Sequence, residues 1–140
     1  MSNKIWEFTG ETKIYFGVTL RRIRASVEFK LKCGIVIDKG ELGGWIEKES
    51  NLSGNAWVSG NAELYGDAVI CNSNDYIVFK NNWSSFRYFT WTRSNDMWKV
   101  GCFYGTGKDL IEKAYKDSKL SGDCYKAYVE LVEKLKELQK

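Results

Sequence analysis

The sequence predicts a mainly β fold with α-helices at its C-terminal end, built as one domain over residues 1–140. Three observations predict it: apolar residues alternate with polar ones in residues 4–31, aliphatic residues recur every six positions from Ile46 to Ile70, and apolar residues have helical spacing at the C-terminal end. At 140 residues the chain has the usual size of a single domain. Its expected parts are N-terminal strands (1–45), a hexapeptide β-helix segment (46–74), a β-meander (75–104) and a two-helix tail (105–140).

Residues 4–31 predict two or three antiparallel strands, because apolar side chains recur along three short runs. Breaks at Thr9-Gly10-Glu11 and Gly17-Val18 are typical of turns. The glycines that follow, Gly34, Gly40, Gly43 and Gly44, predict a loop-rich passage.

The internal repeat reads Gly54-Asn55-Ala56-Trp57-Val58-Ser59, Gly60-Asn61-Ala62-Glu63-Leu64-Tyr65 and Gly66-Asp67-Ala68-Val69-Ile70-Cys71. Such units predict the flat sides of a triangular parallel β-helix coil, with the aliphatic and small side chains pointing inward. An ordinary meander of short strands is the alternative. The N-terminal strands, the following sheet or other copies of the chain must cap so short a coil. We therefore expect a homo-oligomer that associates around Trp57, Val58, Leu64 and Tyr65.

The meander is predicted from three strand-like runs, at residues 76–80, 86–93 and 97–104. Two amphipathic helices are expected at residues 107–118 and 121–138, with Ser121 as N-cap of the second. The apolar stripe of that second helix is expected to contain Cys124, Ala127, Tyr128, Leu131, Leu135 and Leu138.

Composition disfavours catalysis. The chain has no His, which is the commonest general base near neutral pH and a frequent metal ligand, so neither an enzyme nor a metal or other cofactor is expected. The acyltransferases that share the hexapeptide repeat also use a histidine. The segment Gly101–Asp109 is similar to a phosphate-binding loop, but Cys102 and Asp109 stand where that motif requires Gly and Ser or Thr.

The polar N-terminus, the absence of a long apolar run and four scattered cysteines predict a soluble intracellular protein with free thiols. The net charge of +3 is modest, which argues against binding of long nucleic acids.

Aromatic and basic residues interleave most densely in the meander. On a strand, Arg87, Phe89, Trp91 and Arg93 share one face, which suits stacking on a base while the guanidinium groups hold phosphate. The candidate ligand-binding residues are Phe79, Asn82, Arg87, Trp91, Arg93, Lys99, Phe103 and Tyr104. The alternative is that Phe89 and Trp91 pack beneath the helices while the arginine heads reach solvent.

Arg21, Arg22 and Arg24 form a second candidate anion site on the N-terminal strands. The alternative for these residues is a charged strand face that resists edge aggregation.

A resemblance enters at residues 42–53, LGGWIEKESNLS, which lead into the Gly-Asn-Ala repeats. This stretch resembles phage and prophage proteins of Gram-positive hosts, and the repeat, meander and two-helix tail resemble the phage Thoeris anti-defence proteins of the first family. The resemblance implies a sponge that sequesters glyco-linked cyclic ADP-ribose, made by the host TIR enzyme, without cleaving it. It also implies a dimer or hexamer in the cytoplasm of the infected host, and leaves room for a second site for cyclic oligonucleotides. The alternative is a phage structural or assembly protein that oligomerises through its coil.

Overall fold

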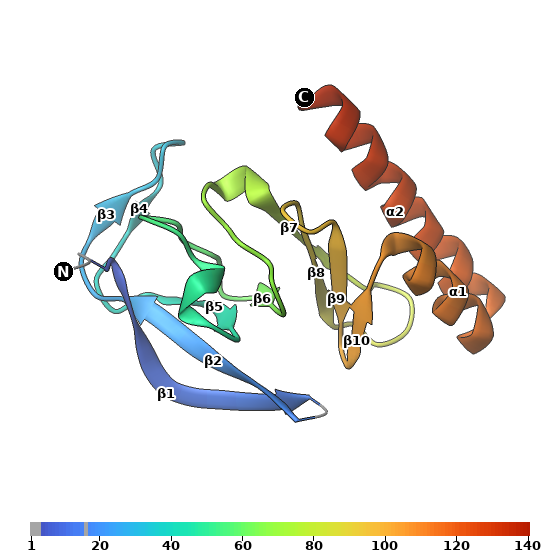
Figure 1. Cartoon of the computed structure of the whole chain (residues 1–140), viewed down its shortest axis with the longest axis horizontal. Coiled ribbons are helices and arrows are strands. Elements are labelled where there is room, and N and C mark those ends of the chain that lie inside the picture. The colour runs from blue at the N-terminus through green and yellow to red at the C-terminus, as the bar shows by residue number, and fades with distance from the viewer. Residues whose placement is uncertain (1–3, 16) are drawn as a thin grey trace.

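The computed structural model describes residues 4–15 and 17–140 and arranges them in three layers (Figure 1). A first sheet and the repeat segment form one layer, a second sheet forms the middle layer, and two helices cover its far face. The described residues contain ten strands and two α-helices, so the predicted mixed β and α class is confirmed.

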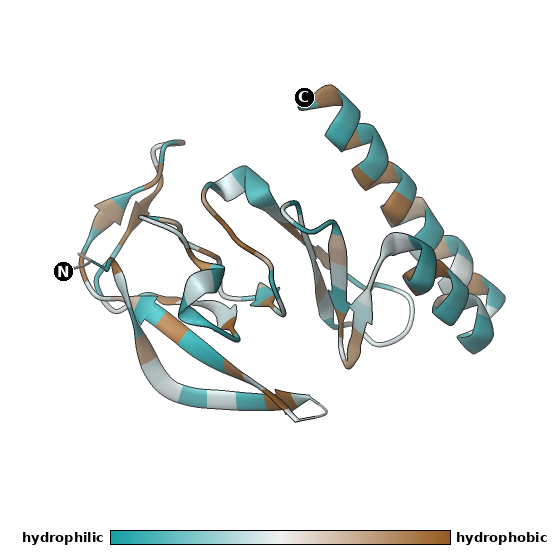
Figure 2. Ribbon diagram, viewed as in Figure 1, coloured by the Kyte–Doolittle hydropathy of each residue, from teal (hydrophilic) through white to brown (hydrophobic). Residues whose placement is uncertain are grey.

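The first sheet has the strand order β1-β2-β5-β6. Its strands are β1 (Trp6–Tyr15), β2 (Val18–Ala25), β5 (Leu42–Ile46) and β6 (Glu63–Leu64). The first three pair antiparallel and β6 runs parallel to β5. A separate two-stranded hairpin joins β3 (Phe29–Lys30) to β4 (Val36–Ile37). Hydrophilic and hydrophobic bands alternate along β1 and β2 in Figure 2, as the sequence predicts for half-buried strands.

Two of the expected glycine breaks are wrong. Gly10 does not end a strand: β1 continues through it, with a register shift between Phe8 and Thr12 where Gly10 has φ +97°. Gly43 and Gly44 lie inside β5 and not in a loop. A Cβ on Gly44 would lie 2.6 Å from the carbonyl oxygen of Ser59, so glycine is required for the repeat segment to approach β5 this closely.

The structure does not show a continuous hexapeptide β-helix coil in the described residues. After Ile46 the repeat segment contains a 3₁₀ turn (Glu49–Asn51), the two-residue strand β6 and an isolated parallel bridge between Leu52 and Ile70. That bridge and the Ile46–Leu64 pair each join residues 18 positions apart, which is three six-residue units. The segment is so short that most of its residues have no parallel neighbour to pair with, which explains why regular strands do not extend.

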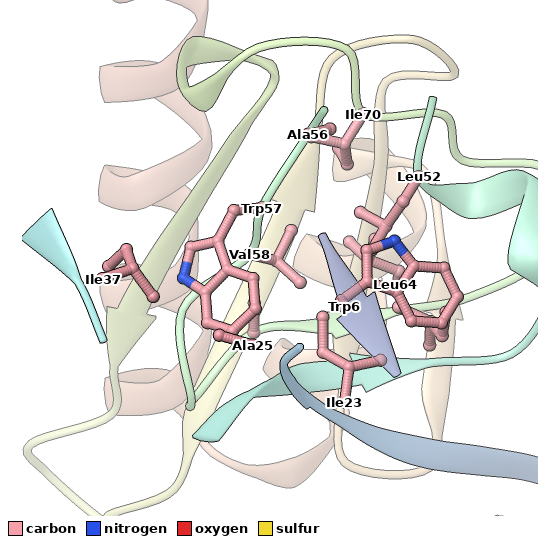
Figure 3. Packing of buried hydrophobic residues seen from close by; sticks show 12 residues of the cluster. Trp6, Ile23, Ala25, Ile37, Leu52, Ala56, Trp57, Val58, Leu64 and Ile70 are labelled. Atoms are coloured by element: carbon pink, nitrogen blue, oxygen red, sulfur yellow. The ribbon is translucent and has the colours of Figure 1, made fainter. Parts of the chain in front are cut away.

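The aliphatic and alanine positions of the repeat form the core of the first layer (Figure 3). Trp57, Val58 and Leu64 are all buried there, together with Ile23 from β2 and Ile37 from β4. The expectation that Trp57, Val58, Leu64 and Tyr65 form an exposed self-association face is wrong for the first three, because the chain's own strands and second sheet already cover them, while Tyr65 is half-buried. The homo-oligomer itself stays a prediction.

The second sheet is antiparallel with the order β10-β9-β8-β7. Its strands are β7 (Tyr76–Lys80), β8 (Tyr88–Thr92), β9 (Met97–Val100) and β10 (Phe103–Gly105), and the short 3₁₀ turn Ser73–Asp75 precedes β7. The prediction for β7 is confirmed at both ends. The expected run 97–104 is two strands, because Gly101 adopts φ +54° in the turn between them.

Both faces of the second sheet are covered. Ile77 and Phe79 pack with the helices, while Tyr76 and Val78 pack against the repeat segment. The sheet is thus the middle layer, and its side facing the repeat segment borders the cavity described below.

The helices are α1 (Gly107–Asp117) and α2 (Lys119–Leu138). Thr106 caps α1, and Ser118 caps α2 by accepting from the Ser121 backbone N–H, so the predicted cap at Ser121 is wrong. The predicted apolar stripe of α2 is only partly correct: Tyr128 packs against the core and Cys124 and Leu135 are half-buried, but Ala127, Leu131 and Leu138 are exposed. The buried residues are Ser121, Gly122, Tyr125 and Val132. No helix in the described part of the chain combines the length and apolarity that a bilayer crossing needs.

Candidate ligand-binding site

Charged and aromatic side chains cluster where the turn end of the β1–β2 hairpin meets the repeat segment and the second sheet. A cavity of about 300 Å³ opens there, which we call cavity A. Its lining residues are Lys13, Tyr15, Trp45, Gly60, Asn61, Glu63, Arg87, Tyr88 and Gly101. The volume lies at the lower end of the range for small-molecule sites. In Figure 1 the hairpin extends beneath β5 and β6 toward the second sheet, which brings residues far apart in sequence to one place.

Glu63 is the centre of this cluster. Its carboxylate accepts from Lys13 Nζ at 2.8 Å and from the Tyr15 hydroxyl at 3.3 Å, and it lies 3.5 Å from Lys99 Nζ. The Glu63 backbone N–H donates to Thr90 Oγ1 at 3.0 Å. These contacts connect β1, the repeat segment and the second sheet, so they fix the walls of cavity A relative to one another.

The cations of the cluster lie over aromatic rings. Lys13 Nζ is 4.1 Å from the Trp45 ring centroid, and Lys99 Nζ is 3.9 Å from that of Tyr15 and 5.2 Å from that of Tyr65. The ring faces are electron-rich and add to the attraction of Glu63. Lys13 is thereby retained on the wall of cavity A and Lys99 behind it, where both can attract an anion.

Burial changes the pKa values of the cluster. Loss of solvent lowers the pKa of Lys99, and Glu63 opposes that change. Burial raises the pKa of Tyr15, and its contact with Glu63 raises it further. Lys99 is 2% exposed and also donates to the Gly101 carbonyl, so it supports the wall of cavity A from behind.

Arg87 and Tyr88 form the rim of cavity A. Among the described residues, no carboxylate pairs with the Arg87 guanidinium and no side-chain hydrogen bond engages it. The Tyr88 ring is 44% exposed. The residue before Arg87, Phe86, is 61% exposed and has φ +58°, a strained conformation for a bulky side chain. The rim therefore presents an unpaired cation beside the exposed ring of Tyr88, and the exposed Phe86 precedes it in the chain.

A second cavity of about 200 Å³, cavity B, adjoins the first. The two share Arg87, Tyr88 and Gly101. The other residues lining cavity B are Asn81, Ser84, Ser85, Val100, Asp117, Ser121 and Tyr125. Cavity B thus lies between the second sheet, the loop before β8 and the two helices.

Three aromatic residues of the sequence-predicted site line neither cavity A nor cavity B. Trp91 is buried among the residues that pack against the helices, where its indole N–H donates to Asp96. Phe79 and Phe103 pack against the same core, and Phe79 stacks 6.0 Å from the ring of Trp98. The alternative reading of the strand face is confirmed: Phe89 and Trp91 lie beneath the helices.

The polar members of that predicted site are scattered. Arg93 donates to Asn74 and Gln139 and lies over Trp91, while the Tyr104 hydroxyl donates to the Tyr65 carbonyl. Asn82 is exposed and lines neither cavity. Of the eight predicted residues, Arg87 lines cavity A and Lys99 lies behind its wall.

The second predicted anion site is not a cluster of free cations. Arg24 pairs with Glu7 at 2.7 Å, Arg22 with Glu11 at 3.6 Å, and Arg21 lies over the ring of Phe8. Cross-strand glutamates thus neutralise Arg22 and Arg24, as expected for a charged strand face.

The sequence-predicted site does not include five residues that line cavity A: Lys13, Tyr15, Trp45, Glu63 and Tyr88. Two signals were available. Lys13 and Tyr15 alternate on one strand face, and Glu63 is the charged residue at a repeat position that Trp57 and Val69 occupy in the neighbouring units.

A larger groove of about 720 Å³ runs between the β3–β4 hairpin and the repeat segment. Lys30 and Lys32 line it, but among the described residues neither forms an ion pair or lies over a ring. Its floor is the packed pair of Phe29 and Trp57. The groove lacks the concentration of charge that distinguishes cavity A.

The described residues contain no group of three or more Cys, Asp or Glu that could hold a metal ion. All four cysteines are free thiols. No family model, no curated protein and no solved structure matches this chain, so the candidate site rests on its own geometry.

Proposed function

We propose that the chain binds and retains a small anionic molecule that carries an aromatic base, the chemistry of a nucleotide, in cavity A. The observation that carries this proposal is the unpaired Arg87 guanidinium at the rim beside the exposed Tyr88, next to a cavity that Lys13 also lines. Arginine binds phosphate oxygens through paired N–H groups, and an exposed tyrosine ring stacks on bases. Arg87 and Lys13 would hold the phosphate, and Tyr88 would stack on the base.

The strain at Phe86 supports the same proposal. A bulky side chain with positive φ costs about 1 to 3 kcal/mol, and such positions cluster at functional sites. The loop is held in this shape because the Asn81 backbone N–H donates to the Arg87 carbonyl at 2.9 Å and the Arg87 N–H donates to Ser85 Oγ. The backbone at Arg87 is therefore fixed before any ligand arrives, which reduces the entropy cost of binding.

The chemistry of the cavity favours retention over turnover. Glu63, the carboxylate that lines cavity A, already accepts from Lys13 and Tyr15 and compensates Lys99. A general base must instead be free to accept a proton from the reacting molecule. Glu63 thus serves as a fixed counter-charge, and the proposed function is sequestration without cleavage.

The resemblance to Thoeris anti-defence proteins selects glyco-linked cyclic ADP-ribose as the first member of this ligand class to test. Such a sponge would act in the cytoplasm of an infected bacterium, where it would lower the concentration of the signal below that needed by its receptor. The adenine of this ligand could stack on the Tyr88 ring, and its diphosphate could pair with the cations Arg87 and Lys13.

Calorimetric titration tests the proposal. Wild type, Arg87→Ala and Tyr88→Ala are titrated with ADP and with cyclic ADP-ribose isomers. Arg21→Ala and Tyr115→Ala are matched controls, since Arg21 and Tyr115 are exposed and lie outside both cavities. Arg87→Ala and Tyr88→Ala should each weaken binding by about 1 to 3 kcal/mol, whereas the two control variants should bind as wild type does.

The ligand recovered after heat denaturation should be intact. Degradation products would overturn sequestration. Absence of binding by wild type would overturn the proposed function and favour the structural or assembly role.

A further inference from the structure

Cavities A and B differ in chemistry although they share a rim. Cavity A is lined by two cations, Lys13 and Arg87, and by one carboxylate, Glu63. Cavity B has a carboxylate, Asp117, facing a wall of hydroxyl groups. Asp117 offsets the charge of Arg87 in cavity B, whereas the cations outnumber the carboxylate in cavity A, so an anion is favoured in cavity A and a neutral, hydrogen-bonding group suits cavity B.

Asp117 is available as an acceptor. It is the last residue of α1, and its side chain is 64% exposed. Its ion pair is with Lys113 on the same helix, at 3.5 Å, and exposed pairs of this kind contribute little. An ionised carboxylate accepts hydrogen bonds at two oxygens, which matches two adjacent hydroxyl donors.

The wall of cavity B is rigidly built. The Asn81 side chain is buried and donates to Ser84 Oγ at 3.1 Å and to the Tyr125 hydroxyl at 3.2 Å, while its oxygen accepts from the Trp83 and Ser84 N–H groups. The Trp83 indole N–H donates to Ser121 Oγ at 3.0 Å. These bonds attach the loop before β8 to α2, so the distance across cavity B is set before a ligand binds.

We infer that cavity B binds the vicinal hydroxyl groups of a sugar, with Asp117 as their acceptor, while the attached phosphate lies at Arg87. This inference rests on the proposed function and specifies its ligand as a ribose-bearing molecule, because a diol joined to a phosphate satisfies both cavities at once. Arg87, which lines both cavities, marks the junction of the two groups.

The test uses two probes that differ only in the diol, ADP and 2′,3′-dideoxy-ADP, titrated by calorimetry into wild type, Asp117→Ala and Asp67→Ala. Asp67 is an exposed carboxylate outside both cavities and is the control. Wild type and Asp67→Ala should bind ADP about 10-fold or more tighter than the dideoxy probe. Asp117→Ala should bind the two probes equally, with dideoxy affinity unchanged. Thermal melting confirms that each variant is folded.

The outcomes separate the two proposals. Equal binding of both probes by wild type overturns the diol inference and leaves the proposed function standing. A preference for ADP that survives in Asp117→Ala overturns the assignment to Asp117. Failure of wild type to bind either probe overturns the proposed function, and the inference with it.

Discussion

The Lys99 ammonium lies 3.5 Å from the Glu63 carboxylate, and the two side chains are 2% and 12% exposed. Because a buried charge is costly without its partner, this pair helps to hold the second sheet and the repeat segment together, beside the hydrogen bonds and apolar packing between them. Lys13 and Tyr15 complete the arrangement from the hairpin. Stability and the candidate site thus depend on the same residues.

Glu63→Gln should lower the free energy of unfolding by about 3 kcal/mol, because Lys99 is left buried without a counter-charge. In the double variant with Lys99→Met the loss should be smaller than the sum of the two single losses by about 1 kcal/mol or more. Urea denaturation measures all three. The control is Glu11→Gln, whose pair with Arg22 is half-exposed and should cost less than about 1 kcal/mol. Additive losses would show that the two charges are independent.

The lowered pKa of Lys99 makes stability depend on pH. The unfolded chain keeps this proton up to the ordinary value of 10.5, whereas the folded chain releases it earlier. Between the lowered pKa of Lys99 and 10.5 the unfolded state binds more protons than the folded state, so the contribution of Lys99 to the free energy of unfolding rises with pH. Below that window the cost of burying the Lys99 charge is fully present.

The measurement is the difference in unfolding free energy between wild type and Lys99→Met across the alkaline range. Tyr15, Tyr65, Tyr104 and Tyr125 have raised pKa values, so above their ordinary value of 10.0 they make stability fall with pH. Comparison with the variant subtracts most of that opposing effect. A difference that stays constant with pH would contradict the role given to Lys99.

Asn51 holds the repeat segment together through four hydrogen bonds. Its side-chain oxygen accepts from the Glu47 and Lys48 N–H groups, and its amide donates to the Gly66 and Ala68 carbonyls. Asn51→Ala should cost about 3 kcal/mol, because buried backbone groups lose their partners. Asn82→Ala, at an exposed position, should change stability by less than about 0.5 kcal/mol. Equal melting temperatures would contradict this account.

Local signals in the sequence predict much of the fold. An apolar run between polar residues defines β7 at both ends, and the spacing of apolar residues predicts both helices. The helix faces were harder to predict. Leu131 and Leu138 continue an apolar stripe on α2 but are exposed, while Gly122 is buried, because Tyr115 of α1 packs closely against that glycine.

The candidate site could not be predicted from local patterns. Alternation shows that Arg87 and Trp91 share a strand face, but both faces of β8 are covered by other layers, so the ring is buried and the cation reaches solvent only at the strand end. Glu63 meets Lys13 across 50 residues and Lys99 across 36. Such contacts depend on how the hairpin crosses the repeat segment, which only the assembled layers determine.

Phe86→Gly should preserve or raise stability while weakening ligand binding. Phe86 is 61% exposed and its φ is +58°, so glycine at this position loses little buried surface and relieves about 1 to 2 kcal/mol of backbone strain. Glycine also gives the unfolded chain more conformational freedom, which opposes this gain by about 0.5 to 1 kcal/mol. Val27→Gly is the matched control, because Val27 is also an exposed apolar residue but is not among the residues with positive φ; it should lose about 0.5 to 1 kcal/mol. Thermal melting gives the stabilities, and titration with ADP gives the affinities. If Phe86→Gly melts lower than wild type by as much as Val27→Gly does, the backbone at Phe86 is not strained. If it binds ADP as wild type does, the exposed ring takes no part in the rim of cavity A, and Arg87 and Tyr88 alone remain as its ligand contacts.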